Sequence, residues 1–281
     1  MTARPGRSLV ASRLSAGYGD VEILHALDVA VPPGQITAIV GANASGKSTL
    51  LRSMSRLMAP THGQVLLDGR SIHETPTREL ARTLGLLPQS PVAPDGIVVA
   101  DLVSRGRHPH RGLFSGWTGQ DDAAVQGALA ATRTLDLADR AVDELSGGQR
   151  QRVWIAMALA QQTDILLLDE PTTFLDINHQ VEILDLLVDL NRSRGTTVVM
   201  VLHDLNLAAR YADHLVALTD GRVHASGAPD HVLTEGTVRT VFGLSSRIMA
   251  DPTSGRPIML PIGRHRMVQE PGRPREDSHE R

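Results

Sequence analysis

The chain has 281 residues, which is enough for one large domain or two small ones, with a hydrophobic core that needs neither disulfides nor metals. Its 28 basic and 31 acidic side chains leave a formal charge of -3, so the chain lacks the global basic field of a dedicated nucleic-acid binder, and no nucleic-acid partner is expected. The absence of cysteine excludes disulfides and thiolate metal sites. No apolar run approaches the roughly 18 residues of a membrane span, and none follows the basic start as it would in a secretory signal.

Strand and helix patterns alternate along most of the chain. Short β-branched or apolar runs predict strands at residues 36–40, 65–67, 165–168, 197–202 and 215–218. A weakly alternating stretch, 9–31, is broken by Gly17-Tyr18-Gly19 and predicts an antiparallel pair of strands. Helical apolar spacing covers 47–58 and 180–194, and Gly195 could cap the second helix. We therefore expect an α/β fold with a mixed, mainly parallel sheet, flanking helices and an N-terminal antiparallel β subdomain.

Residues 91–164 differ in character from the rest. They combine a Pro- and Gly-rich entry with several helical patterns and little strand signal, which predicts a helical subdomain inserted into a domain that spans 8–264. Residues 265–281 are polar and mix Pro, Arg and Glu without periodicity, so we expect a disordered tail there.

A glycine-bounded loop lies between the predicted strand 36–40 and the following helix. Its residues are Gly41-Ala42-Asn43-Ala44-Ser45-Gly46-Lys47-Ser48, which is the spacing of a nucleoside-triphosphate loop. Consecutive backbone N–H groups at a helix N-terminus would cradle phosphate oxygens, and the helix dipole favours their negative charge. Lys47 would add a point charge at the β- and γ-phosphates, and Ser48 would ligate Mg²⁺ through its hydroxyl. Thr49 belongs to the same predicted ATP-binding set.

Lys47 is the only lysine among the 28 basic side chains. A forked guanidinium is bulkier than an ammonium on a flexible stem and is directed differently, so the two are not interchangeable in a tight loop. The single lysine therefore occupies the position where this difference in shape matters.

A buried-strand pattern at 165–168 ends in two adjacent carboxylates, Asp169 and Glu170. Because side chains alternate along a strand, these two carboxylates point in different directions and can do different work. Asp169 would hold Mg²⁺, and Glu170 would polarise the attacking water. A strand that meets a solvated acidic turn is the structural alternative for this string alone.

The string Leu145-Ser146-Gly147-Gly148-Gln149 precedes a helical segment, and its serine and two glycines make a second anion-binding helix start. In its order relative to the other motifs, this string resembles the signature of the ATP-binding-cassette (ABC) ATPases over roughly residues 9–264. The resemblance implies the P-loop ATPase core of that family. It also implies a partner, since in that family the signature faces the γ-phosphate held by a second subunit, so that two copies of the chain sandwich two ATP molecules.

Four further residues take positions that have functions in the ABC family. The resemblance implies that Tyr18 stacks on adenine and that Gln89 joins Mg²⁺ to the transport partner. It also implies that His203 contacts the γ-phosphate and that Asp176 signals across the dimer. Structural alternatives exist for each: Tyr18 could pack a turn, Gln89 could lie in an ordinary loop, and Asp176 could cap the following helix. A lone His203 after an apolar strand could likewise be structural.

The phosphate loop departs from the family pattern at two positions. The family usually has Pro and Gly where this chain has Ala42 and Ala44. If position 44 requires a positive φ angle, alanine costs on the order of 1 kcal/mol there. ATP binding is expected to survive both changes.

Three stretches resemble the ATPase subunits of iron-siderophore, haem and cobalamin importers; they are residues 86–110, 172–180 and 251–264. The resemblance implies an ATPase that docks on transmembrane permease subunits at the cytoplasmic face of the membrane, through the groove beside Gln89 and the helical insert. An extracytoplasmic substrate-binding protein would be an indirect partner. ATP binding would close the dimer and hydrolysis would release it. His108 and His110 could in principle bind metal, although an Arg-rich loop favours a docking surface.

The rival interpretation is an ABC-type ATPase outside transport, such as a soluble scaffold for iron–sulfur cluster assembly. Repair members of the family carry long coiled coils and translation members usually carry two cassettes, and this chain has neither. A nucleotide switch without turnover is disfavoured by Glu170.

Overall fold

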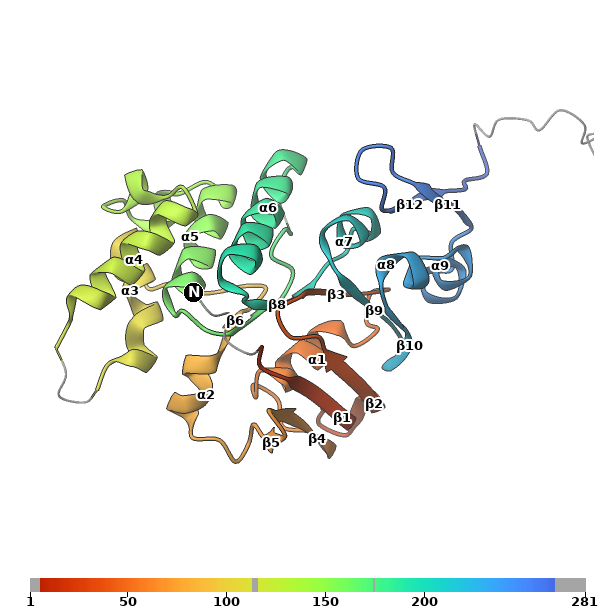
Figure 1. Ribbon diagram of the computed structural model, residues 1–281, viewed down its shortest axis with the longest axis horizontal. Coiled ribbons are helices and arrows are strands. Elements are labelled where there is room, and N and C mark those ends of the chain that lie inside the picture. The colour runs from red at the N-terminus through yellow and green to blue at the C-terminus, as the bar shows by residue number, and fades with distance from the viewer. Residues whose placement is uncertain (1–5, 113–115, 174, 266–281) are drawn as a thin grey trace, which may run out of the picture.

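The computed structural model describes residues 6–112, 116–173 and 175–265, which form two β-sheets, a hairpin and surrounding helices (Figure 1). The larger sheet has the strand order β10-β9-β3-β8-β7-β6. Its strands are β3 (Ile36–Gly41), β6 (Leu84–Leu87), β7 (Ile165–Leu168), β8 (Thr197–Val201), β9 (His214–Thr219) and β10 (Arg222–Gly227). Every neighbouring pair is parallel except β10 with β9. The predicted α/β class with a mixed, mainly parallel sheet is confirmed.

The smaller sheet is antiparallel and comes from the N-terminal part of the chain. Its order is β2-β1-β4-β5. The strands are β1 (Leu9–Tyr18), β2 (Val21–Val31), β4 (His62–Leu67) and β5 (Arg70–Ser71). Between β1 and β2 the chain reverses at Gly19, whose φ of 57° suits glycine. The antiparallel pair predicted for 9–31 is therefore confirmed.

Helix α1 (Lys47–Met54) packs between the two sheets. Its Leu50 and Leu51 are fully buried and share one hydrophobic cluster with both sheets. The large sheet contributes Ile165 and Leu167 of β7 to this cluster. The start of α1, which follows the phosphate loop, is thus held rigidly against the sheet.

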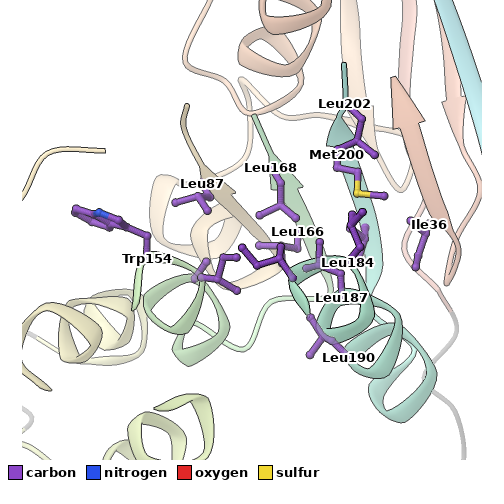
Figure 2. Close-up of a cluster of buried hydrophobic side chains, with 14 of the residues drawn as sticks. Ile36, Leu87, Trp154, Leu166, Leu168, Leu184, Leu187, Leu190, Met200 and Leu202 are labelled. Atoms are coloured by element: carbon purple, nitrogen blue, oxygen red, sulfur yellow. The ribbon is translucent and has the colours of Figure 1, made fainter. Parts of the chain in front are cut away.

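The opposite face of the large sheet is covered by other helices. Figure 2 shows Leu166 and Leu168 of β7 on the same side of the sheet as Leu184 and Leu187 of α6 (Ile177–Arg194), and all four belong to a second buried cluster. Because successive side chains of a strand point to opposite faces, β7 is buried on both sides. This explains the unbroken apolar run at 165–168.

Between β6 and β7 the described part of the chain contains helices joined by loops and no strand, apart from an isolated bridge between Val98 and Ala141. The helices there are α3 (Val99–Ser104), α4 (Gly119–Ala131), α5 (Gly147–Ala160) and the 3-10 turns Arg105–His110, Leu135–Leu137 and Val142–Glu144. They gather at one end of the molecule, on the left of Figure 1. The division into a domain over 8–264 with an insert at 91–164 stays a prediction. Apart from residue 265, the predicted tail lies outside the described residues.

A buried ion pair fastens this helical region together. Arg107 Nε donates to Asp121 Oδ1 at 2.9 Å, and both side chains are almost fully buried. The same guanidinium donates to the carbonyl of Ala160 at 2.8 Å and to Gln162 Oε1 at 3.0 Å. The hydrogen bond from Arg107 holds the pKa of the Asp121 carboxyl below its usual value. Arg107 thus ties the start of α4 to the end of α5.

The predicted helix 47–58 is too long, since α1 ends at Met54. The chain turns at Arg56, which has a positive φ of 62°. The N–H groups of Arg56 and Leu57 bond back to the carbonyls of Ser53 and Arg52, at 3.1 and 2.9 Å. This is the Schellman pattern, with arginine at the position that is usually glycine, so no glycine marks the end of the helix in the sequence.

The helix predicted from residue 180 begins earlier, at Ile177, and ends where Gly195 takes a φ of 69°, as expected for a glycine cap. The remaining helices are α2 (Thr77–Thr83), α7 (Leu205–Tyr211), α8 (Pro229–Val232) and α9 (Glu235–Phe242). Strands β11 (Ser246–Ala250) and β12 (Pro257–Pro261) form a separate antiparallel hairpin. Among the described residues, no helix is both long and apolar enough to cross a membrane.

Candidate functional site

The phosphate loop connects the end of β3 to the start of α1, as its spacing predicts. Gly46 has a φ of 98°, and a Cβ placed on it would lie 2.6 Å from Leu24 Cδ2. Ala44 has a φ of 62°, so it adopts the positive-φ conformation in which alanine is strained. Asn43 and Ala44 are exposed on the loop, whereas Ser45 and Thr49 are buried.

Two groups of the loop fit an anionic ligand. The hydroxyl of Ser45 is buried and has no hydrogen-bond partner within the described part of the chain, which is unusual for a buried polar atom. The loop also opens a helix, where backbone N–H groups and the dipole favour negative charge. The loop can therefore bind phosphate oxygens.

The side chain of Lys47 folds back onto the first residues of the loop. Its Nζ donates to the carbonyls of Gly41 at 3.0 Å and Ala42 at 2.7 Å, and the residue is only 5% exposed. Burial lowers the pKa of the Lys47 ammonium, against the opposing effect of Glu170 and Asp169. A compact ammonium fits between two carbonyls in a space where a guanidinium would be too large.

Ser48 and Asp169 meet across the edge of the sheet. Ser48 Oγ donates to Asp169 Oδ1 at 3.0 Å. Burial, together with the charge of Glu170, raises the pKa of the Asp169 carboxyl, and the bond from Ser48 only partly offsets it. A hydroxyl and a carboxylate are the hard oxygen donors that Mg²⁺ prefers. Phosphate oxygens of a bound substrate and water molecules usually supply its remaining ligands. The pair therefore suits a Mg²⁺ ion.

Glu170 accepts from three different segments. Oε2 accepts from Gln89 Nε2 at 2.6 Å and from Thr173 Oγ1 at 2.9 Å, while Oε1 lies 2.6 Å from His203 Nε2. Burial alone would raise the pKa of this carboxyl, but the hydrogen bonds from Thr173, His203 and Gln89 outweigh burial and lower it. A carboxylate that stays ionised in a buried place can act as a general base.

The backbone at Glu170 adopts an uncommon conformation, with a φ of 54°. A non-glycine residue in this region is often strained at a functional site. Thr173 is the member of this cluster that the sequence did not single out. Its place three residues after the carboxylate, in the turn that follows β7, is the signal that could have identified it.

The signature string opens α5 as predicted. Ser146 Oγ accepts from the N–H of Gln149 at 3.3 Å, and the side chain of Gln149 accepts from the N–H of Ser146 at 3.1 Å. This capping box leaves Gly147 exposed at the helix start. None of the described hydrogen bonds of Ser146 and Gln149 reaches the phosphate loop, so within one chain the structure does not join the signature to that loop.

Tyr18 and Asp176 lie at the margins of the site. Tyr18 is 48% exposed at the end of β1, and its hydroxyl accepts from Arg52 Nη1 at 2.9 Å. Asp176 caps α6 by accepting the N–H of His179 at 2.9 Å, which is the structural alternative considered for it. Adenine stacking by Tyr18 and dimer signalling by Asp176 stay predictions.

The histidines of the Arg-rich segment do not form a metal centre. His110 Nε2 lies 2.7 Å from the carbonyl of Gln161. Burial lowers the pKa of the His110 imidazole. In the described ranges, no group of three or more His, Asp or Glu side chains could hold a metal ion by itself. A docking role for His108 and His110 stays a prediction.

Comparisons with known proteins agree on one family. The family model described as ABC transporter matches residues 24–173, just over half of the chain. The probable siderophore transport system ATP-binding protein YusV of Bacillus subtilis is 55% identical over 92% of this chain and 94% of its own length. The ferric enterobactin transport ATP-binding protein FepC of Escherichia coli is 52% identical over 90% and 93%.

Solved structures give the same result at lower identity. An inward-facing ABC transporter of metal-chelate type superposes with a TM-score of 0.78 at 29% identity and covers 92% of this chain and 98% of that chain. The dimeric structure of MJ0796, a bacterial ABC transporter cassette, superposes with a TM-score of 0.70 at 29% identity and covers 78% and 98%.

Proposed function

We propose that this chain, which belongs to the ABC transporter family, is the ATP-hydrolysing subunit of an importer for an iron–siderophore or related iron-chelate complex. As a member of this family, the chain binds ATP and couples its hydrolysis to transport. The substrate class is supported by relatives that span nearly its whole length and are named for siderophore and ferric enterobactin transport. Haem and cobalamin are the alternative substrates of such an importer.

The arrangement around Glu170 is the observation that carries the ATPase assignment. An ionised, buried carboxylate is held by Gln89, Thr173 and His203, beside the Ser48–Asp169 pair. A general base next to a site suited to a metal is what hydrolysis of a phosphoanhydride requires.

Mg²⁺, when bound with ATP, would neutralise charge that develops on the phosphate oxygens. Ser48 and Asp169 would hold it, with Gln89 as the third protein group. The Ser48 hydroxyl would exchange its bond to Asp169 Oδ1 for the metal. Because burial raises the pKa of Asp169, a nearby cation would also favour its ionised form.

The other residues of the site would divide the remaining work. Residues 41–46 would bind phosphate oxygens through their N–H groups, and Lys47 would turn its ammonium from the carbonyls of the loop to the phosphates. A Glu170 carboxylate oxygen would accept a proton from the attacking water. His203, hydrogen-bonded to the other oxygen, would orient that carboxylate and contact the γ-phosphate.

A second copy of the chain would complete each site. Since Ser146–Gln149 makes no described hydrogen bond to its own phosphate loop, its helix start is free to bind the γ-phosphate held by a partner. Tyr18 would stack on adenine, and Asp176 would lie at the dimer interface. The dimeric cassette among the similar structures supports this arrangement.

The transport partners would be transmembrane permease subunits, reached through the groove beside Gln89 and the helices between β6 and β7. The chain would then work as a peripheral subunit on the cytoplasmic face of the membrane. An extracytoplasmic substrate-binding protein would deliver the iron chelate to the permease. The transporter complex among the similar structures supports such an assembly.

Co-purification decides between transport and a scaffold role in iron–sulfur cluster assembly. The chain should be isolated with a tag after detergent extraction of its source cells, and the bound proteins identified. We expect a stoichiometric membrane permease whose presence raises ATP turnover. Recovery with soluble partners alone would contradict the importer and favour the scaffold.

A further inference from the structure

The imidazole of His179 lies directly against the backbone of Gly148 in the signature string. A Cβ placed on Gly148 would lie 3.1 Å from Cδ2 and 3.3 Å from Cγ of His179, closer than ordinary packing. The ring therefore fills the space that a side chain at position 148 would need. Gly148 is in the first turn of α5 and His179 in the first turn of α6, so the two helix starts are in contact.

One hydrogen bond fixes the orientation of this ring. His179 Nδ1 lies 2.7 Å from Asp176 Oδ1, which also accepts the backbone N–H of His179 at 2.9 Å. These bonds lower the pKa of the Asp176 carboxyl. An ionised carboxylate has no proton to give, so Nδ1 is the donor. The edge of the ring that carries Cδ2 is thereby held against Gly148.

Two more contacts join the next residues of α5 to the segment that follows Glu170. Gln151 Nε2 donates to the carbonyl of Pro171 at 2.9 Å, and Arg152 Nη1 lies 3.0 Å from Glu182 Oε2. Both contacts lie beyond the signature string. Among these three contacts, only that of His179 touches a residue of the signature itself.

We infer that His179 is a positioning residue for ATP hydrolysis, which holds Gly148 and the start of α5 at a fixed place relative to Asp176 and the turn that leaves Glu170. The signature that a chain presents to its partner is then coupled to the carboxylate that serves its own ATP. The inference rests on the proposed function, because Ser146–Gln149 acts on ATP only when a second copy is present. His179 itself would touch neither nucleotide nor water.

The matched substitutions are His179→Asn and His179→Leu. Both keep a Cγ with two attached atoms, which correspond in shape to Nδ1 and Cδ2 of the ring. Only asparagine keeps a donor at the Nδ1 position, so it alone retains the bond to Asp176. His231→Ala, at an exposed histidine of α8, controls for the loss of an imidazole elsewhere.

ATP-driven dimerisation of the full-length Glu170→Gln chain is the measurement, made by analytical ultracentrifugation with each second substitution added. We expect His179→Leu to raise the dimer dissociation constant roughly tenfold, the effect of losing about one hydrogen bond and its packing. His179→Asn should stay within about threefold of the Glu170→Gln parent, and His231→Ala should match the parent. Affinity of the monomer for a fluorescent ATP analogue should be the same for all variants, which separates positioning from binding.

Failure of the inference differs from failure of the proposed function. If the Glu170→Gln parent itself does not dimerise with ATP, the proposed function is wrong. If the parent dimerises and His179→Leu dimerises equally well, the positioning role is wrong. It is also wrong if His179→Asn is as defective as His179→Leu, because the bond to Asp176 would then be irrelevant. A general folding defect would weaken monomer nucleotide binding as well, and that result would also count against the inference.

Discussion

His203 Nε2 lies 2.6 Å from Glu170 Oε1, although the two residues follow different strands. Each is the second residue after its strand, since β7 ends at Leu168 and β8 ends at Val201. Gln89 is likewise the second residue after β6. Because β6, β7 and β8 are parallel neighbours, their carboxyl ends deliver all three side chains to one edge of the sheet.

Glu170→Gln should reduce ATP hydrolysis by about 100-fold or more, because an amide cannot accept a proton from water. The amide is nearly the same size as the carboxylate, so ATP affinity should be retained. Phosphate release and equilibrium binding of a fluorescent nucleotide measure the two properties separately. Glu79→Gln, at an exposed position of α2, should behave like the unmodified chain. Unchanged turnover in Glu170→Gln would refute the role of this carboxylate.

Lys47→Arg should lose ATP binding by at least about tenfold even though the charge is conserved. The reason is space: Lys47 Nζ lies between the carbonyls of Gly41 and Ala42, and the residue is buried. Nucleotide titration measures the effect, and Arg13→Lys at an exposed position supplies a control exchange that should change nothing. Full affinity in Lys47→Arg would mean that shape is not the reason for the only lysine.

Ala44→Gly should stabilise the chain, whereas Ala42→Gly should not. Ala44 has a φ of 62°, where alanine is strained by about 1 kcal/mol or more. Ala42 is not in that conformation, so glycine there only adds freedom to the unfolded chain, at a cost of roughly 0.5–1 kcal/mol. Since the unfolded chain also gains freedom in Ala44→Gly, we expect a net gain below about 1 kcal/mol in thermal or urea unfolding. A large rise in ATP affinity would show that the native loop is impaired.

Asp169→Asn should raise the stability of the nucleotide-free chain near neutral pH. The pKa of Asp169 is raised mainly by burial, so its contribution to stability is present below the unfolded pKa and is lost as the pH rises through the folded pKa. An asparagine oxygen can still accept from Ser48. Thermal melting tests this, since roughly 1 kcal/mol corresponds to about 2–4 °C in a chain of this size.

The same substitution should reduce Mg²⁺-dependent hydrolysis by at least about tenfold, because a negative oxygen ligand is lost. The advantage in stability should shrink at acid pH, where the native Asp169 carboxyl is protonated. A variant that is less stable than the parent at neutral pH would contradict the raised pKa.

The sequence predicted the parts of the molecule that rest on local patterns. The apolar run at 165–168 and the spacing around Lys47 specify strand and loop by themselves, because burial and phosphate binding act on consecutive residues. Gly195 ends α6 as a glycine with positive φ should. These features needed no knowledge of contacts that are distant in the sequence.

Features that depend on distant contacts were not predicted. Arg56 ends α1 without a glycine, while its guanidinium bonds to the carbonyls of Ile72 and Thr75. The ring of His179 reaches Gly148 from another helix. Tertiary packing determines each of these, and no local pattern reports it.

Iron uptake tests the central claim most directly. Cells that lack this chain should be supplied with radioactive iron as a ferric siderophore, and then complemented with the unmodified chain or with Glu170→Gln. We predict that uptake is lost without the chain, is restored by the unmodified chain, and is not restored by Glu170→Gln at equal protein level. Undiminished uptake of ferric siderophores, haem and cobalamin in cells that lack the chain would contradict the account.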